Sequence, residues 1–131
     1  MKITRSGSIP SRTGPADRFT GAVRLDPLND AEPPGTAGCV HVTFEPGART
    51  NWHSHPRGQT LIVTWGRGLC QQEGGPVEQI RAGDTVWFPA HVRHWHGAAA
   101  DTGMSHIAVQ EAEDGVSTDW AEPVSDADYG A

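Results

Sequence analysis

Glycine and proline recur every few residues along this chain, and their spacing is the feature that most limits its fold. Of its 131 residues, 16 are Gly and 10 are Pro. Both residue types favour turns and interrupt helices. The segments between them are short and rich in β-branched and aromatic residues, which is typical of strands. The expected strands are Phe19–Asp26, Cys39–Glu45, Thr50–His55, Thr60–Trp65, Gly68–Glu73, Val77–Ile80, Thr85–Phe88, His94–Ala98 and Met104–Glu111.

Many short strands separated by turns predict an all-β sandwich or barrel. A chain of this length forms one hydrophobic core, so we expect a single domain over residues 1–131. Near the C-terminus, Ser125 is followed three residues later by Asp128. This spacing resembles a helix capping box with Asp in place of Glu, and it predicts a short C-terminal helix.

Charge and hydropathy exclude two classes of partner. The chain carries a net charge of −6, and its acidic residues concentrate from Glu111 to the end, where Lys and Arg are absent. Without a basic stripe, a nucleic-acid partner is not expected, and the acidic tail is interpreted as an aid to solubility. No apolar run approaches the roughly 20 residues that span a membrane, and the first residues have no apolar signal segment. We therefore expect a cytoplasmic protein.

Histidine carries the functional signal, because five of the seven histidines fall in two short clusters. His53 and His55 are separated by one residue, so on a strand their side chains point to the same face. Gln59 follows after a Pro-Arg-Gly turn that can bring the chain back beside them, and His94 lies on another expected strand. Three imidazoles and one amide oxygen form a ligand set for a divalent metal ion.

The two clusters lie in segments with fixed glycine spacing. Residues 47–66, GARTNWHSHPRGQTLIVTWG, read G-x5-H-x-H-x3-Q-x6-G, and residues 83–98, GDTVWFPAHVRHWHGA, read G-x5-P-x-H-x2-H-x3-A. These segments resemble, in the right order, the first and second signature motifs of the cupin family. The resemblance implies a small jelly-roll β-barrel with one metal ion held inside.

Carried over to this sequence, the cupin motifs imply metal ligation by His53, His55, Gln59 and His94. The sequence departs from the usual motifs at three positions. Gln59 replaces the usual Glu, His91 replaces a usual Gly, and Ala98 replaces a usual Asn. We expect the last two changes to affect turn geometry and a hydrogen bond rather than ligation.

The exchange at Gln59 alters the charge of the predicted site. A carboxylate would neutralise one charge of a divalent ion, whereas an amide leaves the full +2, which favours Lewis-acid chemistry and anion binding. Histidine, amide and water ligands suit Mn(II), Fe(II), Ni(II) or Zn(II).

A narrower resemblance covers the whole chain. The stretches GPADRFTG, VTFEPGART, WHSHPRGQTLIV, GDTVWF and HWHGAA, with an H-x3-QE segment starting at His106, are similar to small bacterial manganese-dependent cupin hydroxynitrile lyases. That resemblance favours Mn(II) and implies cleavage or formation of cyanohydrins such as mandelonitrile. It implies His106 as the catalytic base. The predicted substrate contacts are Gln110, His96, Val40, Val42 and Trp87.

Two other functions fit the predicted metal site. One is a cupin dioxygenase that uses Fe(II) and O2, and the other is a non-catalytic cupin that binds a small molecule. Oxygen uptake would indicate the first, and ligand binding without turnover would indicate the second.

The expected strands Thr60–Trp65 and Met104–Glu111 are apolar on both faces, with Ile62, Ile107 and Val109 on the face away from the predicted pocket. A strand exposed on one side should alternate between apolar and polar residues. We therefore expect a second subunit to cover this face, in a homodimer or homotetramer.

Overall fold

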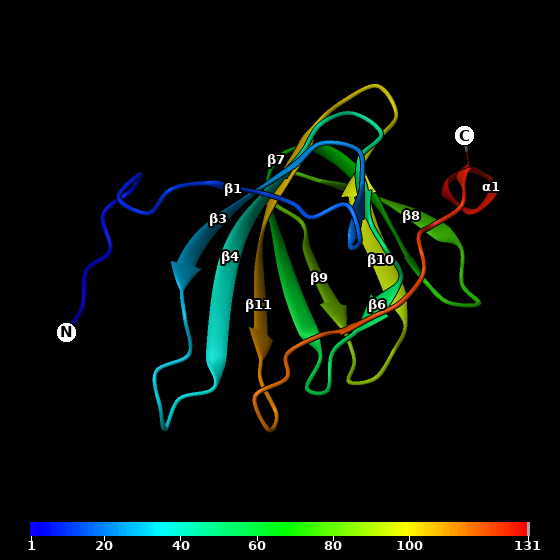
Figure 1. Cartoon of the computed structure of the whole chain (residues 1–131). Coiled ribbons are helices and arrows are strands. Elements are labelled where there is room, and N and C mark those ends of the chain that lie inside the picture. The colour runs from blue at the N-terminus through cyan, green and yellow to red at the C-terminus, as the bar shows by residue number, and fades with distance from the viewer. Residues whose placement is uncertain (131) are drawn as a thin grey trace.

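Two antiparallel β-sheets face each other and share one long strand (Figure 1). The computed structural model describes residues 1–130 of the chain. Its elements are β1 (Arg12–Thr13), β2 (Phe19–Thr20), β3 (Val23–Asn29), β4 (Ala37–Phe44), β5 (Arg49–Thr50), β6 (His53–Ser54), β7 (Gln59–Gln72), β8 (Val77–Arg81), β9 (Thr85–Phe88), β10 (His94–Ala98), β11 (Met104–Glu111), β12 (Asp119–Trp120) and α1 (Asp126–Tyr129). The predicted all-β architecture is confirmed.

The shared strand is β7, which bends at Gly66. Its first half pairs with β11 and β9 in the sheet that also contains β4, β3 and β1, and its second half pairs with β10 and β8 in the other sheet. Gly66 has φ 76°, and a Cβ there would lie 2.0 Å from the carbonyl oxygen of Gly103. Only glycine fits this bend. Because the chain bends here without interrupting β7, the two strands expected on either side of Gly66 are one continuous strand.

Other strand boundaries differ because glycine and short loops divide the predicted runs. The run expected from Phe19 to Asp26 is split into β2 and β3 around Gly21, which has φ 82°. The run expected from Thr50 to His55 belongs to two short strands, β5 and β6. The two-residue strands β1 and β12 were not predicted, because two residues show no alternation.

The hydrophobic core fills one part of the space between the sheets. Strand alternation turns Phe44, Leu61, Val63 and Met104 inward, and each is almost fully buried. Towards the other part of the interior, the inward positions of the same sheets carry histidine and glutamine: His53, His55, Gln59, His94, His96 and His106 are all buried. Burial of so many polar side chains in one region marks it as a candidate functional site.

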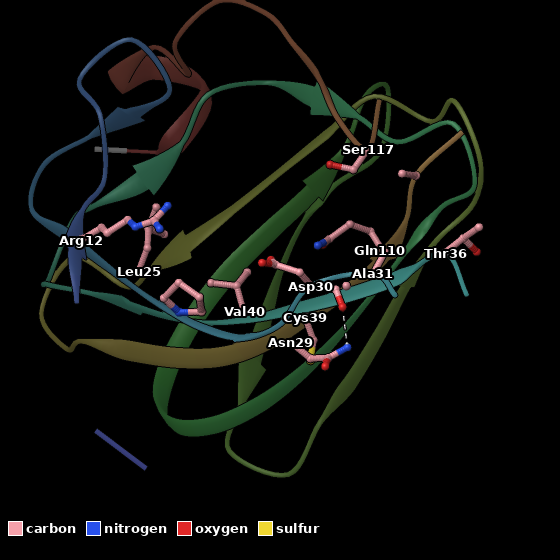
Figure 2. Close-up of a pocket in the computed structure, with 13 residues that line it drawn as sticks. Arg12, Leu25, Asn29, Asp30, Ala31, Thr36, Cys39, Val40, Gln110 and Ser117 are labelled. Carbon is pink, nitrogen blue, oxygen red and sulfur yellow. Dashed lines mark hydrogen bonds between the residues drawn. The ribbon is translucent and has the colours of Figure 1, made fainter. Parts of the chain in front are cut away.

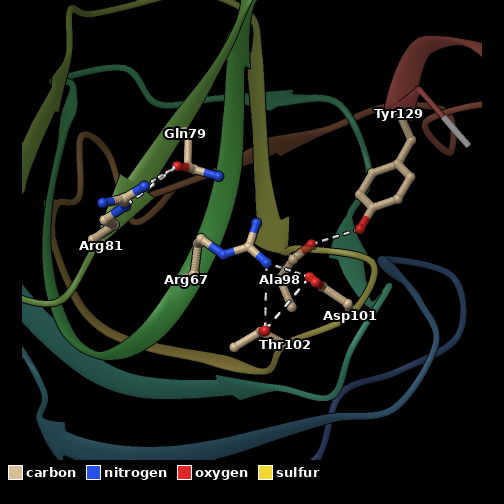
Figure 3. A network of polar contacts seen from close by, with 7 residues as sticks. All are labelled: Arg67, Gln79, Arg81, Ala98, Asp101, Thr102 and Tyr129. Carbon is tan, nitrogen blue, oxygen red and sulfur yellow. Dashed lines mark hydrogen bonds and ion pairs between the residues drawn. The ribbon is translucent and has the colours of Figure 1, made fainter.

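The acidic C-terminal segment packs against the barrel. Helix α1 begins after Ser125, whose side chain accepts a hydrogen bond from the N–H of Asp128 over 3.0 Å, as the capping-box pattern predicted. Tyr129 is buried and donates its hydroxyl to the carbonyl of Ala98 over 2.7 Å (Figure 3). In the same region, Arg67 pairs with Asp101. The segment is therefore part of the folded domain, which its interpretation as a solubility tail did not anticipate.

Within residues 1–130, no helix has the length and the apolar character needed to cross a membrane.

Candidate metal centre

Three histidine side chains in the interior are held in the same way by main-chain carbonyls. In each ring, Nδ1 lies within hydrogen-bond distance of a carbonyl oxygen, so Nδ1 carries the proton and Nε2 presents a lone pair. The rings are His53, His55 and His94, and their partners are the carbonyls of Asn51, Ser117 and Val92, at 2.9, 2.8 and 2.9 Å respectively. This pattern is typical of histidines that bind metal through Nε2.

The three rings lie close together inside the barrel. Strand β6 pairs with β10 so that His53 lies opposite His94, and their ring centroids are 4.3 Å apart. His55 lies 5.1 Å from the first ring and 5.3 Å from the second. Nε2 of His55 is buried without a hydrogen-bond partner among residues 1–130. An unpartnered buried nitrogen of this kind fits a missing ligand such as a metal ion.

Gln59 adds an oxygen to the same space. Its Oε1 lies 3.2 Å from Nε2 of His94, and its Nε2 donates to Oε1 of Gln110 over 3.1 Å. The bond to Gln110 keeps the amide nitrogen turned away from the histidines, so the amide oxygen faces them. Three imidazole nitrogens and this oxygen are a donor set that suits a divalent transition-metal ion.

Two aromatic rings fix the orientation of the histidines. Phe88 stacks on His94 with a centroid distance of 3.7 Å and an angle of 10° between the rings. Trp120 covers His53 at a centroid distance of 4.8 Å. Such packing limits ring rotation and so fixes the directions of the Nε2 atoms.

Burial keeps these imidazoles neutral. It lowers the pKa of His94 to about 3, and it also lowers the pKa of His53 and of His55. The neighbouring His94 lowers the pKa of His53 further. Neutral imidazole is the form that binds metal, so the site is prepared for an ion at neutral pH.

A second pair of histidines lies beside this cluster. Nε2 of His106 on β11 and Nδ1 of His96 on β10 are 3.0 Å apart, at hydrogen-bond distance. Both rings are buried and pack against Phe44, and burial lowers the pKa of His106 to about 3 and that of His96 well below its usual value. Nε2 of His96 and Nδ1 of His106 have no partner within residues 1–130. The pair is therefore uncharged at neutral pH.

His96 also lies close enough to be considered as a ligand. The ring nitrogens of His53, His94 and His96 fall within 4.8 Å of one another, a grouping that can hold a metal ion. His55 falls outside this grouping, although its ring has the same carbonyl anchoring as His53 and His94. Nδ1 of His96 is bonded to His106 and its Nε2 is free within residues 1–130, so the geometry allows either His55 or His96 as the third nitrogen ligand.

These side chains surround an inner cavity of about 150 Å³. The predicted site residues that line the inner cavity are His53, His55, Gln59, His96, His106, Gln110, Val40 and Val42. His94 is fully buried and does not line the inner cavity itself, but it contacts the lining residue Gln59 over 3.2 Å. His41, between the two valines, points to the outside, where it contacts Thr64.

Trp87 is not part of the cavity wall, so its predicted contact with substrate is wrong. In β9 the neighbouring Phe88 points inward, and alternation turns Trp87 to the outer face, where its side chain is 59% exposed. Its ring covers Gly58, where a Cβ would lie only 2.4 Å from the indole. Phe88 is the aromatic residue of this strand that contacts the site, through His94.

Sequence reasoning missed the part of the cavity wall formed by β12 and the loop before it. Trp120 and Thr118 line the inner cavity, as does Arg18, whose guanidinium lies 5.4 Å from the Trp120 ring centroid. Oγ1 of Thr118 lies 3.3 Å from Nδ1 of His55. The one sequence feature that could have indicated this part of the wall is Trp120, an isolated aromatic residue in an otherwise acidic segment.

Acid should destabilise the metal-free protein strongly. The unfolded chain binds a proton at each histidine below about pH 6.5, whereas in the folded state burial lowers the pKa of His94 and of His106 to about 3. Stability is therefore complete above pH 6.5 and falls as the pH drops towards 3, by about 1.4 kcal/mol per pH unit for each such histidine.

Urea unfolding of chelator-treated protein at pH 7, 6 and 5 measures this effect. The denaturation midpoint should fall at each step, and the metal-loaded protein should be less stable at pH 5 than at pH 7 as well. An unchanged midpoint between pH 7 and pH 5 would contradict the neutral, buried state of the histidines.

Comparison with known proteins identifies the family. The family model described as a cupin domain matches residues 40–109. The chain is 57% identical over 129 residues to a protein of Granulicella tundricola named (R)-mandelonitrile lyase, covering 98% of each chain. The chain belongs to the cupin family, as its two histidine motifs indicated.

Solved structures agree with this assignment. A cupin-like protein from Thermotoga maritima matches with a TM-score of 0.85 and 40% identity, over 98% of this chain and 95% of that one. A cupin 2 conserved barrel domain protein from Rhodopseudomonas palustris shares the fold, with a TM-score of 0.72 at 17% identity over 91% of this chain and 80% of that one. His91, one of the departures from the usual cupin motif, has a positive φ of 64°, a conformation that glycine adopts more readily.

Proposed function

We propose that this protein is a metal-dependent hydroxynitrile lyase, which cleaves cyanohydrins such as mandelonitrile to an aldehyde and cyanide, or forms them in reverse. The observation that carries the proposal is the inner cavity itself. It places a neutral histidine pair, His96 and His106, next to three carbonyl-anchored imidazoles. The near full-length similarity to a protein named (R)-mandelonitrile lyase supports the same reaction.

One divalent ion per chain, with Mn(II) favoured, would be held by His53, His55, Gln59 and His94. When bound, the ion supplies Lewis-acid polarisation of the substrate oxygen. The ligands that the chain provides determine the net charge of the site. Because the histidines are neutral and Gln59 is an amide, no ligand offsets the positive charge, and the site favours an anionic product such as cyanide.

His106 acts as the base in this proposal. The hydroxyl proton of the cyanohydrin passes to a ring nitrogen of the pair that has no partner among residues 1–130, Nδ1 of His106 or Nε2 of His96, and the 3.0 Å hydrogen bond couples the two rings. The electron pair of the broken C–C bond leaves with cyanide while the C–O bond becomes a carbonyl. The proton then returns to cyanide to give hydrogen cyanide. A nearby anion raises the pKa of a buried imidazole, so charge development in the substrate strengthens this base.

The remaining cavity residues position the substrate. The amide oxygen of Gln110 is occupied by Gln59, so its NH2 group can donate to the nitrile or the hydroxyl. Val40 and Val42 form part of the apolar wall. An apolar wall opposite polar groups orients an aryl cyanohydrin with its reacting carbon towards the histidine pair.

A cleavage assay tests the proposal. Protein stripped with chelator and reloaded with Mn(II) should release benzaldehyde from mandelonitrile, and the stripped protein should not. Parallel reloading with Fe(II), Ni(II) and Zn(II) identifies the active ion. The proposal fails if every loaded form leaves aromatic and aliphatic cyanohydrins intact. Oxygen uptake with a diketone would then indicate a dioxygenase, and ligand binding without turnover would indicate a binding protein.

We also infer that the outer face of the first sheet is an interface between copies of this chain. Ile62 is 40% exposed there, and Ile107 lies opposite it in the register of β7 and β11. The same apolar face includes Trp87 and Val109. Both residues pair with Thr60, which lies on the same face of β7 as Ile62. Exposed apolar surface of this kind is typical of protein interfaces.

Light scattering at micromolar concentration should give at least twice the 14.0 kDa of one chain. Ile62→Glu should shift the mass towards the monomer, since it would bury a charge in the interface. Val77→Glu, at an exposed valine on β8 in the other sheet, is the matched control and should leave the mass unchanged. A mass near 14.0 kDa for the unmodified protein would contradict the interface.

A further inference from the structure

A second cavity adjoins the inner cavity and shares part of its lining. Figure 2 shows the residues that line this outer cavity. Its volume is about 320 Å³, and that of the inner cavity is about 150 Å³. Three residues line both: Leu25 on β3, Val40 on β4 and Gln110 on β11. These three side chains lie at the boundary between the two cavities, and we call them the neck. A ligand long enough to pass the neck would occupy both cavities.

The two cavities differ in chemistry. Beyond the neck, the outer cavity is lined by Arg12, Asp30, Asn29 and Ser117, which supply a guanidinium, a carboxylate, an amide and a hydroxyl (Figure 2). None of the ion pairs within residues 1–130 includes the guanidinium or this carboxylate. Both groups are therefore available to a ligand. The neck, by contrast, has two aliphatic side chains.

We propose that the outer cavity is a subsite for the far end of an extended aromatic cyanohydrin, one whose ring carries a substituent ending in a hydrogen-bonding group. The inference rests on the proposed function. An aryl ring between the aliphatic side chains of Leu25 and Val40 has its reacting carbon next to the histidine pair. A para substituent on that ring points in the opposite direction, through the neck and into the outer cavity.

The polar lining determines which substituent fits. A chain with an apolar end would cover the guanidinium of Arg12 and the carboxylate of Asp30 without replacing their water contacts, which costs free energy. A terminal hydroxyl can donate to the carboxylate and accept from the guanidinium. The subsite therefore selects for a polar end at equal substituent length.

Two aldehydes of equal length test this selection. They are 4-(2-hydroxyethoxy)benzaldehyde and 4-propoxybenzaldehyde, which differ by a hydroxyl in place of a methyl group. With the metal-loaded protein, the hydroxyl compound should have a Kd lower by about three- to tenfold in calorimetry, the usual effect of one added hydrogen bond. The cyanohydrins of the two aldehydes should differ in kcat/KM in the same direction.

Two substitutions fill the outer cavity and leave the inner one intact. Ala31 and Ala112 line the outer cavity only, so Ala31→Trp and Ala112→Trp should raise the Kd of the hydroxyl aldehyde by about tenfold or more. Both should leave mandelonitrile cleavage within about twofold of the unmodified protein, since its unsubstituted ring ends at the neck. Ala100→Trp, at an exposed alanine outside both cavities, is the matched control.

Two outcomes would overturn the subsite. Equal affinity of the unmodified protein for the two aldehydes would show that the outer cavity makes no polar contact with the substituent. Equal losses for mandelonitrile and the extended compounds in the tryptophan variants would show that it is an entrance alone. If the aldehydes bind with the expected preference but no cyanohydrin is cleaved, the proposed function fails and the subsite stands.

Discussion

His106→Ala should reduce kcat/KM for mandelonitrile by about 10²- to 10⁴-fold, the usual contribution of a general base. The substitution removes the ring that shares a proton with His96 over 3.0 Å. It leaves the carbonyl-anchored histidines in place, because none of them bonds to His106. Bound metal should therefore remain at one ion per chain, measured by elemental analysis on the same sample.

The matched control for this substitution is His41→Ala. His41 lies on β4, which pairs with β11 and places it opposite Ile107, but its ring points to the outer face and contacts Thr64. The His41→Ala variant should cleave mandelonitrile at a near-normal rate. The role of His106 as base is wrong if its alanine variant cleaves mandelonitrile at close to the normal rate with equal metal content.

His55→Ala and His94→Ala should each abolish metal binding at micromolar metal. Losing an outer hydrogen bond to a ligand typically weakens metal binding by about 10- to 100-fold, and losing a ligand should cost at least that much. Cleavage should fall to the level of chelator-treated protein. Equilibrium dialysis against Mn(II), followed by elemental analysis, measures the loss.

His96→Ala distinguishes the two possible ligand sets. The ring nitrogens of His96 lie within 4.8 Å of those of His53 and His94, yet its Nδ1 is engaged with His106. We expect His96→Ala to retain the metal and lose cleavage. Metal loss in this variant, with retention in His55→Ala, would reverse the assignment of the third nitrogen ligand. His91→Gly, in an exposed turn that already has a positive φ, should leave both properties unchanged.

The cluster of buried histidines was predictable from sequence to the extent that local spacing determines it. His53 and His55 flank one residue near the start of the first motif, and the offsets of Gln59 and His94 follow the cupin pattern. The resemblance to the lyases also implied that Val40 and Val42 face the cavity, and both line it. These features depend on periodicity within one strand or on a motif, and a sequence displays both.

Features that depend on distant segments were not predictable in this way. Trp120 lines the cavity because two residues of β12 pair with β6, a contact between segments more than sixty positions apart. Trp87 was assigned to the cavity because an aromatic residue next to a metal motif is a reasonable wall. The pairing of β9 with β7 determines which of its side chains face inward. It turns Phe88 inward and Trp87 outward.

The anchoring of the histidine rings has a consequence for how this protein can evolve. The acceptors that orient His53, His55 and His94 are main-chain carbonyls of Asn51, Ser117 and Val92. Every amino acid has a main-chain carbonyl, so a mutation at these three positions cannot delete the acceptor. Random variation can therefore reshape the cavity lining while the metal-facing geometry is inherited unchanged, which makes this scaffold a tolerant starting point for selecting new substrates.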